Sequence, residues 1–253
     1  MKAKILSGIF KLCNQFLKLK NAKRRKILVY TDSRGFNVVS KLGKTPFDSY
    51  IRTLAWNFNV EYYICPEKYT TIIDFLECVK NKDIRQYDIV LLHCGVVDFS
   101  PRPLSNIEKL LESKRGSAAF EKLRTENRSY YNQPYDVVYS GEKTVTLYSK
   151  EYLSNEVIPE LKQIKNLVWI NSNHFVKGWE GNFTKGRPAN IEKLVNEYDS
   201  LLMQNLANVI DLKIWGEKEI MENTIDNIHF TKKGFGQVYK LLHGKLEGIT
   251  GKL

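Results

Sequence analysis

Two short segments far apart in the chain carry side chains that could together perform nucleophilic catalysis. Ser33 follows the apolar run Lys26–Thr31, and Asp226 stands three residues before His229. A serine on a turn after a strand can act as a nucleophile, and an imidazole can take its proton. At a spacing of three on a turn, the carboxylate can accept from one ring nitrogen while the other faces the serine. The sequence therefore predicts a triad of Ser33, His229 and Asp226.

Strand and helix patterns alternate along the rest of the chain, which predicts a parallel sheet covered on both faces. We expect strands at Lys26–Thr31, Val60–Cys65, Ile89–Cys94, Leu167–Asn171 and Val209–Asp211. We expect helices at Tyr50–Phe58, Thr71–Lys80, Glu151–Ile164, Ile191–Leu206 and Lys233–Leu246. Such a sheet binds ligands beyond the carboxyl ends of its strands. The segments expected to meet there are Thr31–Ser33, Gly95–Asp98, Asn171–His174 and Asp226–His229.

The length and composition fit one α/β domain over residues 26–253. The chain has 253 residues, 43% of them hydrophobic, which is enough for one substantial core. Its four cysteines have no paired spacing, which is typical of a reducing, cytoplasmic compartment. No cluster has metal-ligand spacing and no glycine-rich phosphate loop follows a strand. No metal and no cofactor are therefore expected.

The formal charge of +11 is concentrated at the start of the chain. Residues 1–26 contain nine Lys and Arg residues and no Asp or Glu. Because the whole chain has 39 basic and 28 acidic residues, the remainder keeps 30 basic residues against the same 28 acidic ones. A nearly neutral body gives no electrostatic basis for binding a phosphate backbone, so nucleic acid is not an expected partner.

Residues 1–25 form a predicted basic amphipathic helix. Its apolar positions are Ile5, Ile9, Leu12, Phe16 and Leu19. Lysines recur on the other side, and no small-residue cleavage site follows, so neither a secretory signal nor a spanning helix is expected. A helix on an anionic membrane surface fits this pattern, and would place the protein peripherally at the inner face of the membrane. The alternative is a helix that packs on its own domain or on a second subunit.

An insertion at about residues 100–150 interrupts the alternation of strands and helices. It is polar and rich in Tyr, Arg, Pro and Gly. Segments of this kind over a catalytic edge shape substrate pockets, and Arg102, Tyr130, Tyr131 and Tyr135 could hold a sugar or an anionic group. The alternative is a partly mobile surface excursion without a ligand.

Three segments together resemble conserved blocks of the SGNH (GDSL-like) hydrolases. They are Thr31-Asp32-Ser33, Gly95-Val96-Val97-Asp98 and Asp226-Asn227-Ile228-His229, and the resemblance extends from about Lys26 to the end. It implies a flavodoxin-like three-layer α/β/α sandwich with a five-stranded parallel sheet. It also implies a metal-free esterase, lipase, carbohydrate deacetylase or O-acyltransferase. In this resemblance Ser33 is the nucleophile, His229 the base and Asp226 the residue that orients it.

The sequence departs from the family at the oxyanion donors. Val97 stands where the family has an Asn that donates to the oxyanion, and the block-two glycine has no clear counterpart. Losing one donor typically costs about a hundred- to a thousandfold in turnover, so another group must substitute or the chemistry is slow. The substitutes include the backbone N–H of Ser33 or Arg34, and Lys68. Further candidate oxyanion or substrate-binding residues are the Arg34 side chain, Gly95, Asp98, Arg102, Asn173 and His174.

The predicted function is acyl transfer through a covalent ester on Ser33. The expected substrate is an acylated carbohydrate, such as a surface polysaccharide or its precursor, with water or a sugar hydroxyl as the acceptor. The alternative is a catalytically degenerate member of the fold that binds or assembles a glycan without cleaving it.

Overall fold

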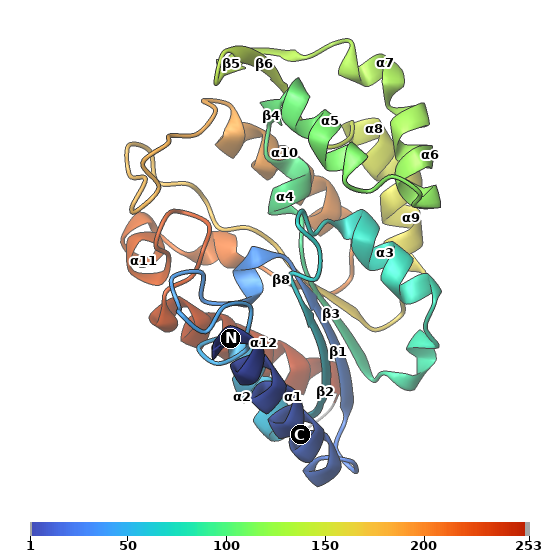
Figure 1. Ribbon diagram of the computed structural model, residues 1–253, viewed down its shortest axis with the longest axis vertical. Coiled ribbons are helices and arrows are strands. Elements are labelled where there is room, and N and C mark those ends of the chain that lie inside the picture. The colour runs from blue at the N-terminus through green and yellow to red at the C-terminus, as the bar shows by residue number, and fades with distance from the viewer. Residues whose placement is uncertain (1, 251–253) are drawn as a thin grey trace.

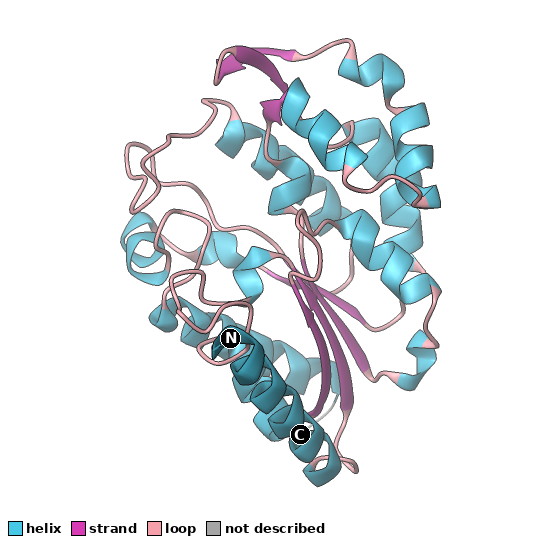
Figure 2. Cartoon of the chain, in the orientation of Figure 1, coloured by secondary structure: helices cyan, strands magenta, loops and turns pink. Residues whose placement is uncertain are grey.

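A computed structural model of the chain describes residues 2–250 and contains a five-stranded parallel sheet (Figures 1 and 2). Its strands are β1 (Lys26–Thr31), β2 (Asn59–Ile64), β3 (Ile89–His93), β7 (Leu167–Ile170) and β8 (Val209–Ile210). Their order is β2-β1-β3-β7-β8. This is the flavodoxin-like order, in which the connections reverse direction between β1 and β3. The predicted fold class is confirmed, and each predicted strand agrees with an observed one to within one residue at each end.

The central strands are apolar on both faces because helices cover both sides of the sheet. Along β1, Ile27 and Val29 enter one core, while Leu28 and Tyr30 enter the other. β1 pairs with both β2 and β3, so that Thr31 lies opposite Ile64 on one side and His93 on the other. This pairing fixes the carboxyl end of β1, where Ser33 follows, in the middle of the sheet edge.

Helices form a layer on each face of the sheet (Figure 1). One layer contains α1 (Lys2–Lys20), α2 (Tyr50–Asn57), α11 (Glu217–Asn223) and α12 (Lys232–Thr250). The other contains α3 (Ile72–Lys80), α8 (Lys150–Tyr152), α9 (Ile158–Lys162) and α10 (Ile191–Asn205). A π-helical turn, Leu153–Val157, joins α8 to α9, so the single helix predicted there is interrupted. Pro159, which has no N–H to donate, lies in the first turn of α9.

The insertion is a folded part of the molecule rather than a loose surface excursion. It contains α5 (Leu104–Glu112), α6 (Ala118–Glu126) and α7 (Arg128–Tyr131), which follow α4 (Val96–Phe99). A small antiparallel sheet of β4 (Arg102–Pro103), β6 (Glu142–Val145) and β5 (Tyr135–Tyr139) accompanies them. Ile107, Phe120 and Leu147 are buried in the same core as α3 and α10. This burial explains why so polar a segment folds: most of its large apolar residues enter the core, although Val138 on β5 stays exposed.

Helix α1 packs on its own domain with one face and leaves another face outward. Leu17 contacts the core, and the Asn21 side chain just after the helix donates to the carbonyl oxygen of Ala55 at 2.9 Å. Leu12, Phe16 and Leu19 are 68%, 68% and 77% exposed. These three residues, called here the α1 stripe, belong to the predicted apolar face. None of the helices in residues 2–250 is long and apolar enough to cross a membrane.

Candidate active site

Ser33 lies on a tight turn directly after β1. It begins a short 3-10 helix, Ser33–Gly35, which the Asp32 side chain caps by accepting from the backbone N–H of Arg34 at 2.9 Å. A Cβ on Gly35 would lie 1.9 Å from the Thr31 hydroxyl oxygen, so only glycine allows the chain to turn back this closely on the strand. The turn presents the Ser33 hydroxyl at the sheet edge.

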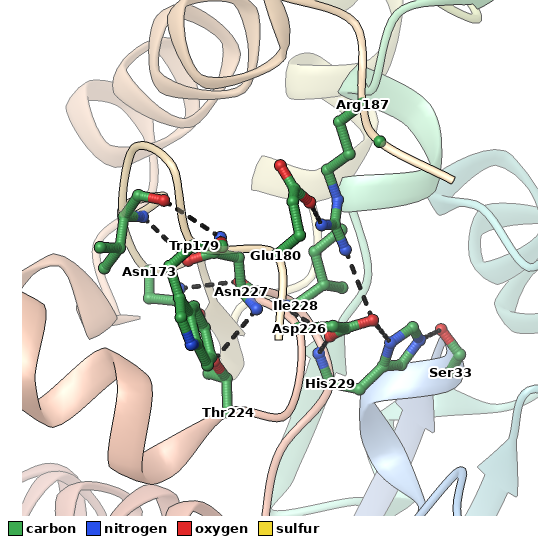
Figure 3. A network of polar contacts seen from close by, with 12 residues as sticks. Ser33, Asn173, Trp179, Glu180, Arg187, Thr224, Asp226, Asn227, Ile228 and His229 are labelled. Carbon is green, nitrogen blue, oxygen red and sulfur yellow. Dashed lines mark hydrogen bonds and ion pairs between the residues drawn. The ribbon is translucent and has the colours of Figure 1, made fainter. Parts of the chain in front are cut away.

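The three side chains of the predicted triad lie in line (Figure 3). The hydroxyl oxygen of Ser33 lies 3.0 Å from Nε2 of His229, and Nδ1 of His229 lies 2.8 Å from Oδ2 of Asp226. Because Asp226 can only accept when ionised, Nδ1 carries the proton and Nε2 is the acceptor for the serine hydroxyl. Such an arrangement can remove a proton from Ser33 and return it to a leaving group.

The Asp226 carboxylate is held by the turn that also carries the imidazole. Its Oδ1 accepts from the backbone N–H of Ile228 at 3.1 Å and of His229 at 2.7 Å. Burial raises the pKa of Asp226, but hydrogen bonds and charge from His229 outweigh it, and the pKa is lowered overall. Asp226 therefore stays ionised at neutral pH, as an orienting carboxylate must.

The side chain of Arg34 is engaged inside the protein and is not free to donate to an oxyanion. Its guanidinium is buried, pairs with Asp32 at 3.0 Å and donates to the carbonyl oxygen of Asn171 at 3.0 Å. Its backbone N–H is used by the Asp32 cap. The pair thus ties the turn after β1 to the end of β7 and supports Ser33 from beneath.

Asn173 and His174 also lie at this edge, but in different surroundings. The Asn173 side-chain amide donates to the carbonyl oxygens of His174 at 2.6 Å and of Asn227 at 2.9 Å, so it is not free for an oxyanion. The His174 side chain is 44% exposed and lies 4.0 Å from a carboxylate oxygen of Glu192. The backbone N–H of Ser33, at the first helical position, has no intrahelical acceptor and remains a candidate donor.

Asp98, which follows β3, connects neighbouring segments of the fold. Gly95 adopts a φ of +136° that a side chain would strain, and it begins α4. Asp98 is fully buried, and its Oδ1 accepts from the backbone N–H of Ile72 and from the Tyr148 hydroxyl, each at 3.0 Å. Burial raises the pKa of Asp98 to about 8. The side chain of Asp98 therefore joins three segments rather than facing substrate.

The remaining sequence candidates lie outside the triad's contacts. Arg102 is half-buried on β4, opposite Val145 of β6. Lys68 is exposed in the loop between β2 and α3, with its ammonium over the Tyr69 ring. His93 is buried in the core and hydrogen-bonds to Tyr50. In the part of the chain that is described, no group of His, Cys, Asp and Glu side chains could hold a metal ion.

Sequence reasoning missed Arg187 and Glu180, which come from the segment between β7 and α10. Nη2 of Arg187 lies 3.4 Å from Oδ2 of Asp226, and its Nη1 contacts the Glu180 carboxylate. No periodicity or motif marks Arg187, which is one of many basic residues and sits between Gly186 and Pro188. Only its contact across the fold identifies it.

Comparison with known proteins agrees with this fold. No family model and no curated protein sequence matches the chain. The chain is similar to a lipase/acylhydrolase from Enterococcus faecalis, at 14% identity, with 89% of this chain and 96% of that one covered and a TM-score of 0.47. It is also similar to a member of the lipolytic protein G-D-S-L family from Veillonella parvula, at 13% identity, with 90% and 100% covered and a TM-score of 0.46.

A further solved structure matches at 14% identity with a TM-score of 0.51, over 90% of this chain and 99% of that one. Identities this low speak only to the fold. Together with the strand order, the match at a TM-score of 0.51 shows that the chain has a doubly wound α/β fold with a parallel sheet.

Proposed function

We propose that this protein is a serine-dependent ester hydrolase or O-acyltransferase that acts on an acylated carbohydrate. The observation that carries the proposal is the continuous contact from Ser33 through His229 to Asp226, with distances of 3.0 and 2.8 Å. In this proposal Ser33 is the nucleophile, His229 the general base and acid, and Asp226 the residue that orients the imidazole and stabilises its charged form.

The reaction proceeds in two halves. Nε2 of His229 takes the hydroxyl proton as the Ser33 oxygen attacks the ester carbonyl carbon, and a tetrahedral oxyanion forms. The bond from that carbon to the alkoxy oxygen then breaks, and the alcohol leaves with the proton from Nε2. In the second half, water or a sugar hydroxyl gives a proton to Nε2 of His229 as its oxygen attacks the acyl carbon. The bond from that carbon to the Ser33 oxygen then breaks, and Ser33 takes the proton back from Nε2. Water gives hydrolysis, and a sugar hydroxyl gives acyl transfer.

The insertion supports a carbohydrate substrate. A groove of about 1040 Å³ lies between α5, α6, α7 and the loop at Lys68 and Tyr69. Its lining includes the buried apolar residues Ile107 and Leu111 and the half-buried ring of Tyr131. Four cations also line it, and among the described residues none of them forms an ion pair: Lys68, Lys109, Arg124 and Arg128. They outnumber the two carboxylates of the lining, Glu108 and Glu112, and no triad residue lies in this lining. This combination suits an oligosaccharide that carries anionic groups. The hydroxyls of Tyr130 and Tyr131, which the sequence suggested as sugar ligands, bond instead to Thr146 and Leu147.

The α1 stripe supports attachment to an anionic membrane surface. Three large apolar side chains that stay exposed on one helix need a partner, and the nine basic residues of positions 1–26 favour anionic lipid. We place the protein in the cytoplasm at the inner face of the membrane. The four cysteines support this placement because they are unpaired in the described part of the chain.

Labelling with a fluorophosphonate tests the catalytic proposal. The intact mass of the protein should increase by one adduct, and the adduct should be absent from the Ser33→Ala and His229→Ala variants. If the unmodified sequence forms no adduct, the triad is inert and a glycan-binding or assembly role on the same fold takes its place.

A further inference from the structure

The segment between β7 and α10 folds onto the turn that carries the triad's acid and base. The side chain of Asn227 accepts from the backbone N–H of Val176 at 2.8 Å, and its amide donates to the carbonyl oxygen of Trp179. The backbone N–H of Asn182 donates to the carbonyl oxygen of Ile225 at 2.9 Å. These bonds place residues 173–187 against residues 225–227, on both sides of Asp226 in the sequence (Figure 3).

Close approach between these two stretches depends on glycine. Gly181 has a φ of +54°, and a Cβ there would lie 2.0 Å from the carbonyl oxygen of Ile225. Any side chain would push the segment off the turn. The contact is therefore built into the backbone rather than made only by flexible side chains.

Arg187 lies at the end of this segment and contacts the triad directly. Nη2 of Arg187 lies 3.4 Å from Oδ2 of Asp226, while Nη1 contacts the carboxylate of Glu180. The guanidinium carbon lies 4.4 Å from the centre of the Phe183 ring, and the side chain is 7% exposed. A guanidinium held between two carboxylates and a ring, away from water, is fixed in position.

The contacts of Asp226 leave its carboxylate no freedom to rotate. Oδ1 is held by two backbone N–H groups, and Oδ2 lies between Nδ1 of His229 and Nη2 of Arg187. The guanidinium of Arg187 and the imidazole of His229 therefore contact the same oxygen, Oδ2 of Asp226, which is the oxygen that orients the imidazole.

We propose that Arg187 is a positioning residue of the triad, which fixes the Asp226 carboxylate and weakens its hold on the charged imidazole, and that Glu180 moderates this effect. The inference rests on the proposed serine chemistry. A positive charge beside the carboxylate opposes protonation of His229, whereas a negative charge behind the arginine reduces that opposition. Arg187 therefore offsets part of the attraction that the Asp226 carboxylate exerts on a charged imidazole.

Other charged groups near the triad are paired among themselves. Asp32 and Arg34, beside Ser33, form a buried ion pair. Lys232, at the start of α12, lies 3.8 Å from Asp48. Of the described charged side chains, only Arg187 forms an ion pair with Asp226 besides His229.

Because Arg187 and Glu180 carry opposite charges, removing each charge should shift the measured values in opposite directions. The pH midpoint of Ser33 phosphonylation by a fluorophosphonate is measured, together with the pKa of His229 by NMR, in the full-length protein. Arg187→Met should raise both by about one pH unit, and Glu180→Gln should lower both by a smaller amount. Arg187→Lys, which keeps the charge, should restore the midpoint but not the full rate. Arg85→Met, which removes an exposed arginine paired with Asp83, should change neither.

The proposal is overturned if both values stay unchanged in Arg187→Met and Glu180→Gln, or if the two variants move them in the same direction. If Arg187→Met does not fold, Glu180→Gln decides alone: values that stay unchanged or rise in it overturn the proposal, and a midpoint that moves in Arg187→Lys overturns it as well. If the unmodified sequence forms no adduct, the proposed function fails, while the NMR titration of His229 still tests the role of Arg187.

Discussion

The hydroxyl of Tyr148 donates a hydrogen bond of 3.0 Å to the carboxyl group of Asp98, and so joins the end of the insertion to the loop after β3. A backbone hydrogen bond reinforces this contact, because the N–H of Leu147 donates to the carbonyl oxygen of Asp98 at 3.0 Å. Asp98 also accepts from the first residue of α3. One buried carboxyl group thus fixes the insertion relative to the sheet edge.

We expect Asp98 to make the protein less stable as pH rises. Its folded-state pKa of about 8 is raised above that of the unfolded chain, so the folded protein binds the extra proton between those two values. The free energy of unfolding should therefore fall with increasing pH, by about 1.4 kcal/mol per unit from this group. The free energy of unfolding of the Asp98→Asn variant, measured by urea denaturation between pH 5 and 7, should fall less steeply with pH than that of the unmodified protein, by the same amount per pH unit. Equal slopes in the two proteins would contradict the burial argument.

Val97→Asn should increase turnover of an aryl ester by about ten- to a hundredfold. The resemblance to SGNH hydrolases implies a side-chain donor at this position. Losing such a donor costs about a hundred- to a thousandfold in turnover, and an added one should recover part of that. The matched control is Val97→Ala, which removes the same methyl groups without adding a donor. Similar turnover rates in the two variants would mean that a side chain at position 97 does not reach the oxyanion and that other groups donate to it.

Gly35→Ala should destabilise the protein by about 1–3 kcal/mol and remove reactivity of Ser33. The new Cβ would lie 1.9 Å from the hydroxyl oxygen of Thr31, so β1 or the turn must shift. Gly244→Ala is the control because a Cβ there meets nothing within 4 Å in the middle of α12. That variant should be more stable by about 0.5–1 kcal/mol, since alanine favours helix. Thermal unfolding of both variants measures the difference.

Replacing Arg124 and Arg128 together with Gln should raise KM for an anionic acylated oligosaccharide by about tenfold. KM for the neutral counterpart should stay the same, because only charge is removed from the groove. Arg85→Gln is the control, because it removes an exposed arginine that pairs with Asp83, and neither residue lines the groove. A KM that rises equally for both oligosaccharides would argue against charge recognition there.

Replacing the α1 stripe with serine should abolish binding of the full-length chain to vesicles that contain anionic phospholipid. The unmodified chain should bind these vesicles but not neutral ones, and added salt should weaken binding because charge contributes. Val138→Ser, which removes another exposed apolar residue, should leave binding intact. A chain that ignores vesicles but loses self-association with the stripe would point to a second copy as the partner.

The local pattern of apolar and polar residues along the chain determined the strands of the sheet and its helices. Strands such as β1 and β3 are short apolar runs that end in turn residues, and helices α10 and α12 carry periodic apolar positions. These signals lie within a few residues of one another, so neighbouring side chains suffice to specify them. The same logic placed Ser33 and His229 at one edge, because the carboxyl ends of parallel strands converge.

Tertiary structure alone decided which polar groups are available to a substrate. Arg34 looks accessible in the sequence but is buried against Asp32, and the Asn173 amide is consumed by the backbone of Asn227. Arg187, which carries no local signal, reaches Asp226 from another loop. The type of a charged or amide residue does not reveal its partners. Its role depends on the groups that the fold brings within a few ångströms. The sequence therefore determined the elements and their order, while long-range packing determined the partners of each polar group.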